Sequence, residues 1–117
     1  MWARFEMIER YLRGRLEDPN AQSMNVRMDR RINRQEELKI GTIVFNYFSE
    51  GLNRSLIVMM QCLNDGECEF TRLCDKAPHQ NAVDFPFIGF RYENGMTDER
   101  FVELFQQWFR YSKVNYN

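Results

Sequence analysis

The sequence predicts a mainly helical domain, and three observations favour this fold class. Apolar residues in segment 2–17 recur at spacings of three and four. Asn33 followed by Glu36 has the spacing of a helix-capping box. Thr97 precedes two acidic residues, which suit the positive end of a helix dipole. We therefore expect three or four helices in a single domain spanning residues 1–117, a length that fits one hydrophobic core.

The first helix is expected over residues 2–17, with one apolar side formed by Trp2, Phe5, Ile8, Leu12 and Leu16. Pro19 ends it, because proline disfavours helical geometry in the residue before it. Residues 18–32 show no clear period and are interpreted as a polar connector rich in arginine.

A second helix is expected over residues 34–50, with Gly51 as its C-terminal cap. Segment 40–48 is rich in β-branched and aromatic residues, so a strand is the alternative there. The run 56–63 is apolar enough to be buried, and its periodicity does not choose between helix and strand. Residues 64–96 are expected to be irregular, with an extended aromatic stretch at 85–92.

If segments 40–48, 56–63 and 85–92 are all strands, the fold is instead α+β with a small antiparallel sheet. A last helix is expected over residues 97–113 in both cases. Its apolar stripe is wider than one core contact needs, which predicts a helix-mediated interface with a protein partner or a second copy. The alternative is that the stripe is core alone. The predicted interface residues are Val102, Phe105 and Phe109.

The formal net charge of −1 gives the chain no overall field for nucleic acid or membrane. Arginine nevertheless outnumbers lysine, and arginine is suited to bidentate contacts with carboxylate or phosphate. A basic cluster in the connector is the candidate site for RNA or a protein partner, with a solvated face as the alternative: Arg27, Arg30, Arg31 and Arg34. The longest apolar run, 56–60, is too short to span a membrane.

All cysteines and the single histidine fall within eighteen residues, at positions Cys62, Cys68, Cys74 and His79. Three thiolates and an imidazole form a standard tetrahedral zinc set, so the spacing predicts a structural zinc ion. The alternative interpretation is buried thiols and a surface histidine. Three thiols without a secretory signal indicate a reducing compartment, the cytoplasm or the nucleus.

The stretch from Gly66 to Cys74 resembles the middle of a CCCH-type zinc finger, in which a glycine closely precedes the second cysteine and an aromatic residue follows it. The resemblance covers residues 62–79 only. It implies that the three cysteines and His79 are the ligands, and that the module binds single-stranded RNA through backbone groups and stacked aromatic rings.

Nothing in the sequence has the pattern of a catalytic site. The glycines are dispersed, so no phosphate-binding loop is predicted, and the acid pairs at 36–37 and 98–99 are typical of helix starts. The expected function is therefore non-enzymatic: an intracellular adaptor or regulatory domain that acts through protein–protein contacts, without a small-molecule substrate. The alternative is a zinc-dependent RNA-binding module.

Overall fold

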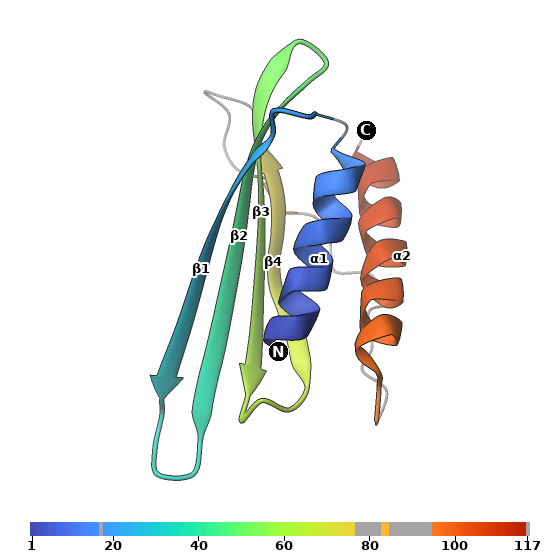
Figure 1. Ribbon diagram of the computed structural model, residues 1–117. Helices are drawn as coiled ribbons and strands as arrows, with labels where there is room; N and C mark the ends of the chain where they lie inside the picture. Colours follow the sequence, from blue (N-terminus) through green and yellow to red (C-terminus); the bar gives the residue numbers. More distant parts are fainter. Residues whose placement is uncertain (17, 77–82, 85–94, 117) are drawn as a thin grey trace.

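The fold is α+β, with an antiparallel sheet and two helices packed on one of its faces (Figure 1). The computed structural model describes residues 1–16, 18–76, 83–84 and 95–116. Along the chain the elements are α1 (Trp2–Arg15), β1 (Gln22–Arg31), β2 (Glu37–Ser49), β3 (Leu52–Leu63), β4 (Cys68–Lys76), β5 (Val83–Asp84) and α2 (Asp98–Tyr116). The prediction of a mainly helical domain is therefore wrong, and the small-sheet alternative is closer to the observed architecture.

The strands lie in the sheet in their order along the chain, β1-β2-β3-β4-β5, and every neighbouring pair is antiparallel. Short hairpins join β1 to β2, β2 to β3 and β3 to β4. At the β2–β3 turn Glu50 and Gly51 both have positive φ, and at the β3–β4 turn Asn64 and Asp65 do the same. Such left-handed pairs are typical of hairpin turns that match the twist of the strands.

The predicted helix over 34–50 is strand β2, and the capping-box signal before it belongs to a hairpin. The Asn33 side chain caps the β1–β2 turn, where its Oδ1 accepts hydrogen bonds from the backbone N–H groups of Gln35 at 2.8 Å and Glu36 at 2.9 Å. An asparagine that bonds to the backbone two and three residues ahead serves a turn as well as a helix start. The β-branched residues of segment 40–48 favour the strand.

The connector predicted over residues 18–32 is also wrong, because β1 occupies most of it. Met24, Val26 and Met28 alternate with polar residues, which is the period-two pattern of a strand. The run 56–63 lies in β3, and β4 occupies part of the region expected to be irregular. The extended stretch predicted at 85–92 lies outside the described residues.

Aromatic side chains fill the space between the helices and the sheet. The Phe70 ring of β4 lies 5.3 Å from that of Phe101, 4.8 Å from Phe105 and 5.2 Å from Trp108, measured between ring centroids. Tyr11 of α1 meets Phe105 edge-on at 6.2 Å. The two helices therefore pack on each other and on one face of the sheet, and this contact forms the core.

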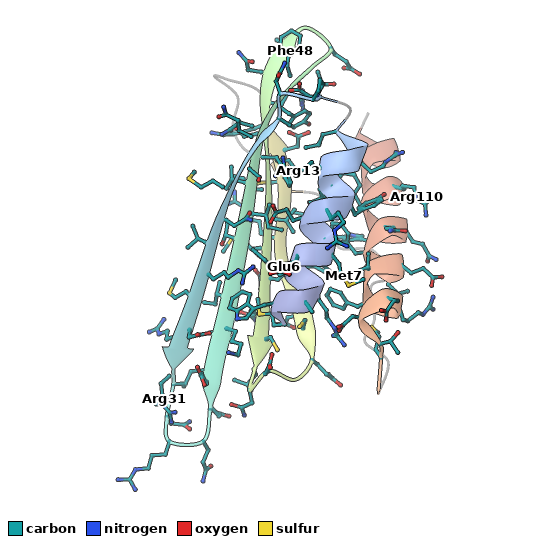
Figure 2. All side chains as sticks on the ribbon, viewed as in Figure 1. Glu6, Met7, Arg13, Arg31, Phe48 and Arg110 are labelled. Carbon is teal, nitrogen blue, oxygen red and sulfur yellow. The ribbon has the colours of Figure 1, made fainter. Side chains whose placement is uncertain are left out.

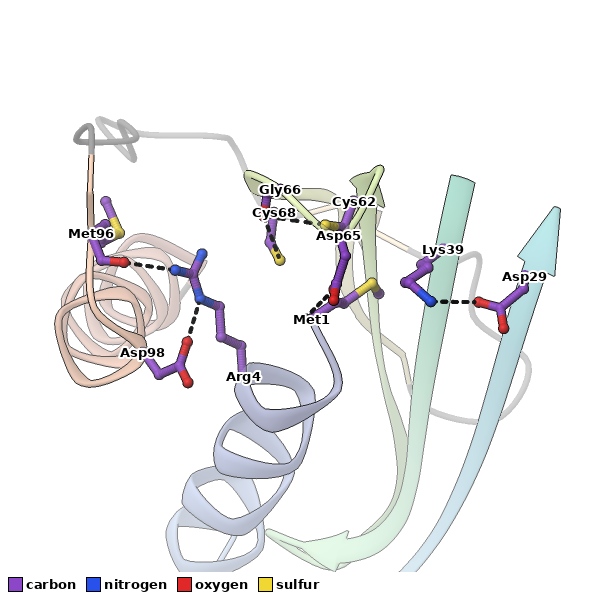
Figure 3. Close-up of polar contacts among 10 residues, drawn as sticks. All are labelled: Met1, Arg4, Asp29, Lys39, Cys62, Asp65, Gly66, Cys68, Met96 and Asp98. Atoms are coloured by element: carbon purple, nitrogen blue, oxygen red, sulfur yellow. Dashed lines mark hydrogen bonds and ion pairs between the residues drawn. The ribbon is translucent and has the colours of Figure 1, made fainter. Parts of the chain in front are cut away.

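Arg4 joins the start of α1 to the start of α2 (Figure 3). Its Nε donates to Asp98 Oδ1 and a terminal nitrogen donates to the carbonyl of Met96, both at 2.8 Å. Its guanidinium also lies 4.8 Å from the ring centroid of Phe101. Charge-assisted hydrogen bonds and the ring contact together fix the relative position of the two helix starts.

Gly41 of β2 lets α1 approach the sheet, because the Phe5 ring lies where a Cβ atom would be. A Cβ built on Gly41 would stand 2.6 Å from Phe5 Cδ2 and 3.2 Å from a carbon of the Trp2 ring. We predict that Gly41→Ala lowers the free energy of unfolding by about 1–3 kcal/mol, the usual cost of overpacking a core. Urea denaturation measures this change.

Gly14→Ala is the matched control, since nothing lies within 4 Å of a Cβ at that helical position. It should raise the stability by about 0.5–1 kcal/mol, because alanine restricts the unfolded chain and favours helix. Equal effects of the two substitutions would contradict the close contact between α1 and β2.

Candidate binding surface

The side of the sheet away from the helices, which we call the open face, is rich in apolar side chains. On β2 and β3 the residues directed to the helices are buried, for example Phe45 and Val58, and the residues between them point to the open face. The strand register sets these apolar residues in adjoining rows over three strands: Met24, Val26, Met28, Leu38, Ile40, Val44, Ile57, Met59 and Leu63.

Strand β1 carries the most exposed part of this face. Met24 is 60% exposed, Val26 52% and Met28 49%. Side chains that contain sulfur project from β1 on the side away from the helices (Figure 2). Contiguous exposed apolar residues on a small protein are uncommon and mark surfaces that bind other molecules.

Along β2 and β3 the buried apolar residues face the helices. Along β1 the pattern is reversed, because its polar residues face the helices. Arg27 lies 2.8 Å from Glu6 Oε1, and its guanidinium stands 5.2 Å from the Trp2 ring centroid. Asn25 donates to Glu9, also on α1. The helix side of β1 is thus polar and hydrogen-bonded, while its apolar residues are on the open face, where no described helix or strand covers them.

A hollow of about 510 Å³ lies at the end of the open face near the β3–β4 turn, lined by Leu38, Gln61, Leu63, Glu67 and Glu69. Two of these residues are apolar and two are acidic. Its polar groups carry negative charge, which disfavours phosphate. The hollow is therefore suited to a partner protein that places an apolar side chain in it and basic side chains around it.

A second hollow, of about 630 Å³, lies at the opposite end of the strands, and its lining includes Tyr47, Arg54 and Lys76. Below it, the Tyr47 hydroxyl donates to Asp75 Oδ2 at 2.7 Å, and Arg54 Nε lies 3.3 Å from the same oxygen. Burial, and then the Asp75 carboxylate, raise the pKa of Tyr47 well above its usual value. The phenol stays protonated, so this cluster ties β2, β3 and β4 together rather than supplying a base.

The predicted zinc ligands are divided between the two faces of the sheet. Cys62 and Cys68 are opposite each other on β3 and β4 and point to the helices, whereas Cys74 pairs with Ile57 and belongs to the open-face row. The thiols of Cys62 and Cys68 lie 3.3 Å and 3.9 Å from the carbonyl of Gly66 (Figure 3). His79 lies outside the described residues.

Burial, and then the neighbouring Cys68, raise the pKa of the Cys62 thiol to about 12. Within residues 1–76, apart from residue 17, and within 95–116, no group of three or more His, Cys, Asp or Glu side chains could hold a metal ion. Zinc binding stays a prediction without support from these residues.

The predicted arginine cluster is split in the same way. Arg27 is engaged with α1, as described above. Arg30 and Arg31 are on the last residues of β1, and Arg34 lies in the hairpin turn, with its carbonyl 3.3 Å from Arg31. Arg31 lies at the far tip of the sheet in Figure 2. Three exposed cations therefore share one hairpin and stand apart from the helices.

The residues predicted to form an interface on the last helix are part of the monomer core. Phe105 and Phe109 are almost fully buried and Val102 is 7% exposed. The ring of Phe109 meets Tyr11 edge-on at 6.2 Å. The wide apolar stripe of α2 is thus packed against α1 and β4, and these three side chains are almost entirely buried.

No protein-family model, curated protein or solved structure matches this chain. Of the two helices that the structure describes, neither is long and apolar enough to cross a membrane. The open face was not found by sequence reasoning, although the signal was present: the apolar residues at 24, 26 and 28 have strand periodicity in a segment interpreted as a connector.

The alternative that the hairpin arginines bind RNA makes a direct prediction. Replacing Arg30, Arg31 and Arg34 together with glutamine should flatten the dependence of log affinity on log salt by about two, since each phosphate neutralised on a single strand contributes about 0.7. Fluorescence anisotropy with an RNA oligonucleotide measures this slope. Arg100→Gln on α2 is the control with one charge removed elsewhere. An unchanged slope in the triple variant would exclude the hairpin as the RNA site.

Proposed function

We propose that this domain is a non-enzymatic protein-binding module and that the open face is its binding surface. The observation that carries the proposal is the reversed alternation of β1. Met24, Val26 and Met28 lie on the open face while the polar residues between them bond to α1. A strand that needed only to close this domain would direct its apolar residues toward the helices.

The energetics favour a protein as the partner. Complete burial of one such side chain contributes about 1.5–3 kcal/mol relative to exposure, so several together are sufficient for specific association. Two of the three exposed apolar residues on β1 are methionines, whose flexible side chains adapt to a partner surface. A flat apolar area with charged residues at its margin, such as Arg30 and Glu69, has the composition of a protein interface rather than that of a substrate cleft.

The buried titratable side chains on the helix side of the sheet contact side chains of neighbouring strands. The Asp75 carboxylate is held by Tyr47 and Arg54, and the thiols of Cys62 and Cys68 face each other across a strand pair. None of these groups lies on the open face. This arrangement supports a binding role. We propose the cytoplasm or the nucleus as its place, because the three cysteines form no disulfide with one another.

Val44→Lys tests the proposal, because it puts a charge in the middle of the open face. Gln107→Lys adds the same charge on an exposed position of α2 and serves as the control. We predict that the immobilised wild type and Gln107→Lys capture equal amounts of one partner protein from cell extract. Val44→Lys should capture at least about tenfold less of that protein, since a lysine in an apolar contact costs about 1.4 kcal/mol or more.

The same partner, once purified, should bind the wild type with a negative change in heat capacity, the mark of apolar burial. Calorimetry at several temperatures measures it. Equal affinity for the wild type and Val44→Lys would contradict the open face as the binding surface.

A further inference from the structure

The outer edge of β1 is a second unpartnered feature of the sheet. β1 is the first strand in the sheet order and has a described neighbour on one side only. It runs for ten residues without proline, and its charged residues, Arg27, Asp29, Arg30 and Arg31, carry both signs. An edge of this length is a template for pairing with another strand.

The hydrogen-bond pattern shows which backbone groups of β1 are available. The N–H of Ile32 donates to the carbonyl of Glu36, directly opposite in the β1–β2 register, at 2.9 Å. In an antiparallel pair such hydrogen-bonded positions alternate. Val26 and Met28 therefore direct their backbone groups to β2. The residues that direct theirs to the free edge are Ser23, Asn25, Arg27, Asp29 and Arg31.

The charges on this edge are self-complementary in one register. When two copies of β1 pair about a two-fold axis, a centre at Arg27 sets two arginines opposite each other, and a centre at Asp29 does the same with two carboxylates. A centre at Met28 instead sets each Arg27 opposite Asp29 of the second copy, twice in the dimer. Within one chain Arg27 lies 2.8 Å from Glu6 and Asp29 lies 3.4 Å from Lys39 (Figure 3), so the new pairs would join these exposed ion pairs into a network. Opposite charges across a strand pair stabilise it, and like charges oppose it.

The same register joins the exposed apolar residues. On the open face, Met28 meets Met28 of the second copy, and Met24 meets its Ile32, which is 53% exposed in the single chain. Val26 meets the aliphatic stem of Arg30. Every exposed apolar residue from 24 to 32 thus gains a cross-strand neighbour, while the backbone groups of the odd-numbered residues gain hydrogen bonds.

We propose that a second copy of this chain pairs with it along β1, antiparallel and centred on Met28. The axis is perpendicular to the sheet, so the helices of both copies lie on one side and the two open faces become one continuous surface. The inference extends the proposed function by naming one partner. It rests on the same strand, yet it leaves the middle of the open face, around Val44, available for another protein.

Asn25→Pro tests the pairing without touching the β1–β2 ladder, because the N–H that it removes points to the free edge. Asn25→Ala is the matched control, since both variants lose the side-chain bond to Glu9. Light scattering from about 1 μM to about 1 mM should show wild type and Asn25→Ala approaching twice 14.2 kDa, with the dissociation constant of Asn25→Pro at least about tenfold higher. Circular dichroism checks that both variants fold.

The register is tested by single cysteines in the open-face row. Met28→Cys should form an intermolecular disulfide under mild copper-catalysed oxidation, because the introduced sulfurs of the two copies meet at the two-fold axis. Val26→Cys, equally exposed, should not, because it faces Arg30 of the second copy. A wild type that is monomeric throughout, or cross-linking of Val26→Cys in place of Met28→Cys, overturns the proposal.

These outcomes are separate from those of the proposed function. A monomeric protein whose partner is lost in Val44→Lys would refute the pairing along β1 and keep the open face as a binding surface. A dimer whose partner binding is unaffected by Val44→Lys would keep the pairing along β1 and refute the open face as a binding surface.

Discussion

The two helices cover one face of the sheet, and the other features of this domain follow from that constraint. The core closes between α1, α2 and the helix side of β2, β3 and β4, where Phe5 packs on Gly41 and Phe70 packs on α2. The aromatic residues Phe101, Phe105, Trp108 and Phe109 of α2 are buried in this layer. The apolar residues on the other side of the same strands then have no described helix to pack against.

Strand β1 continues this second apolar face. Its polar residues Arg27 and Asn25 contact Glu6 and Glu9 of α1. Its apolar residues extend the rows begun by Val44 and Ile57. A surface strand with no partner would gain nothing from methionine and valine at these positions. The edge of the same strand carries charges of both signs, so in our proposals one segment supplies both a face and an edge for association.

The sequence predicted both helices, with boundaries close to those of α1 and α2, because each has a continuous apolar stripe and local start or stop signals. It did not predict the sheet. Asn33 and Glu36 fit a helix cap and a hairpin turn equally, and 56–63 is apolar on both faces, so local periodicity could not decide. The cysteines lie six residues apart in the sequence, so the pleat alone would put Cys68 and Cys74 on the same face. The β-bulge in β4 opposite Met59 and Met60 sends Cys74 to the other face. Only the strand register reveals that separation.

The most direct measurement of the central claim, that β1 is where this chain meets a partner, is hydrogen exchange of single amides by NMR at low and high protein concentration. Val26 and Met28, bonded to β2, should be protected at both concentrations. Asn25, Arg27 and Asp29, directed to the free edge, should exchange fast when dilute and become protected at least about tenfold when concentrated. Protection of these three amides that does not change with concentration would contradict the account.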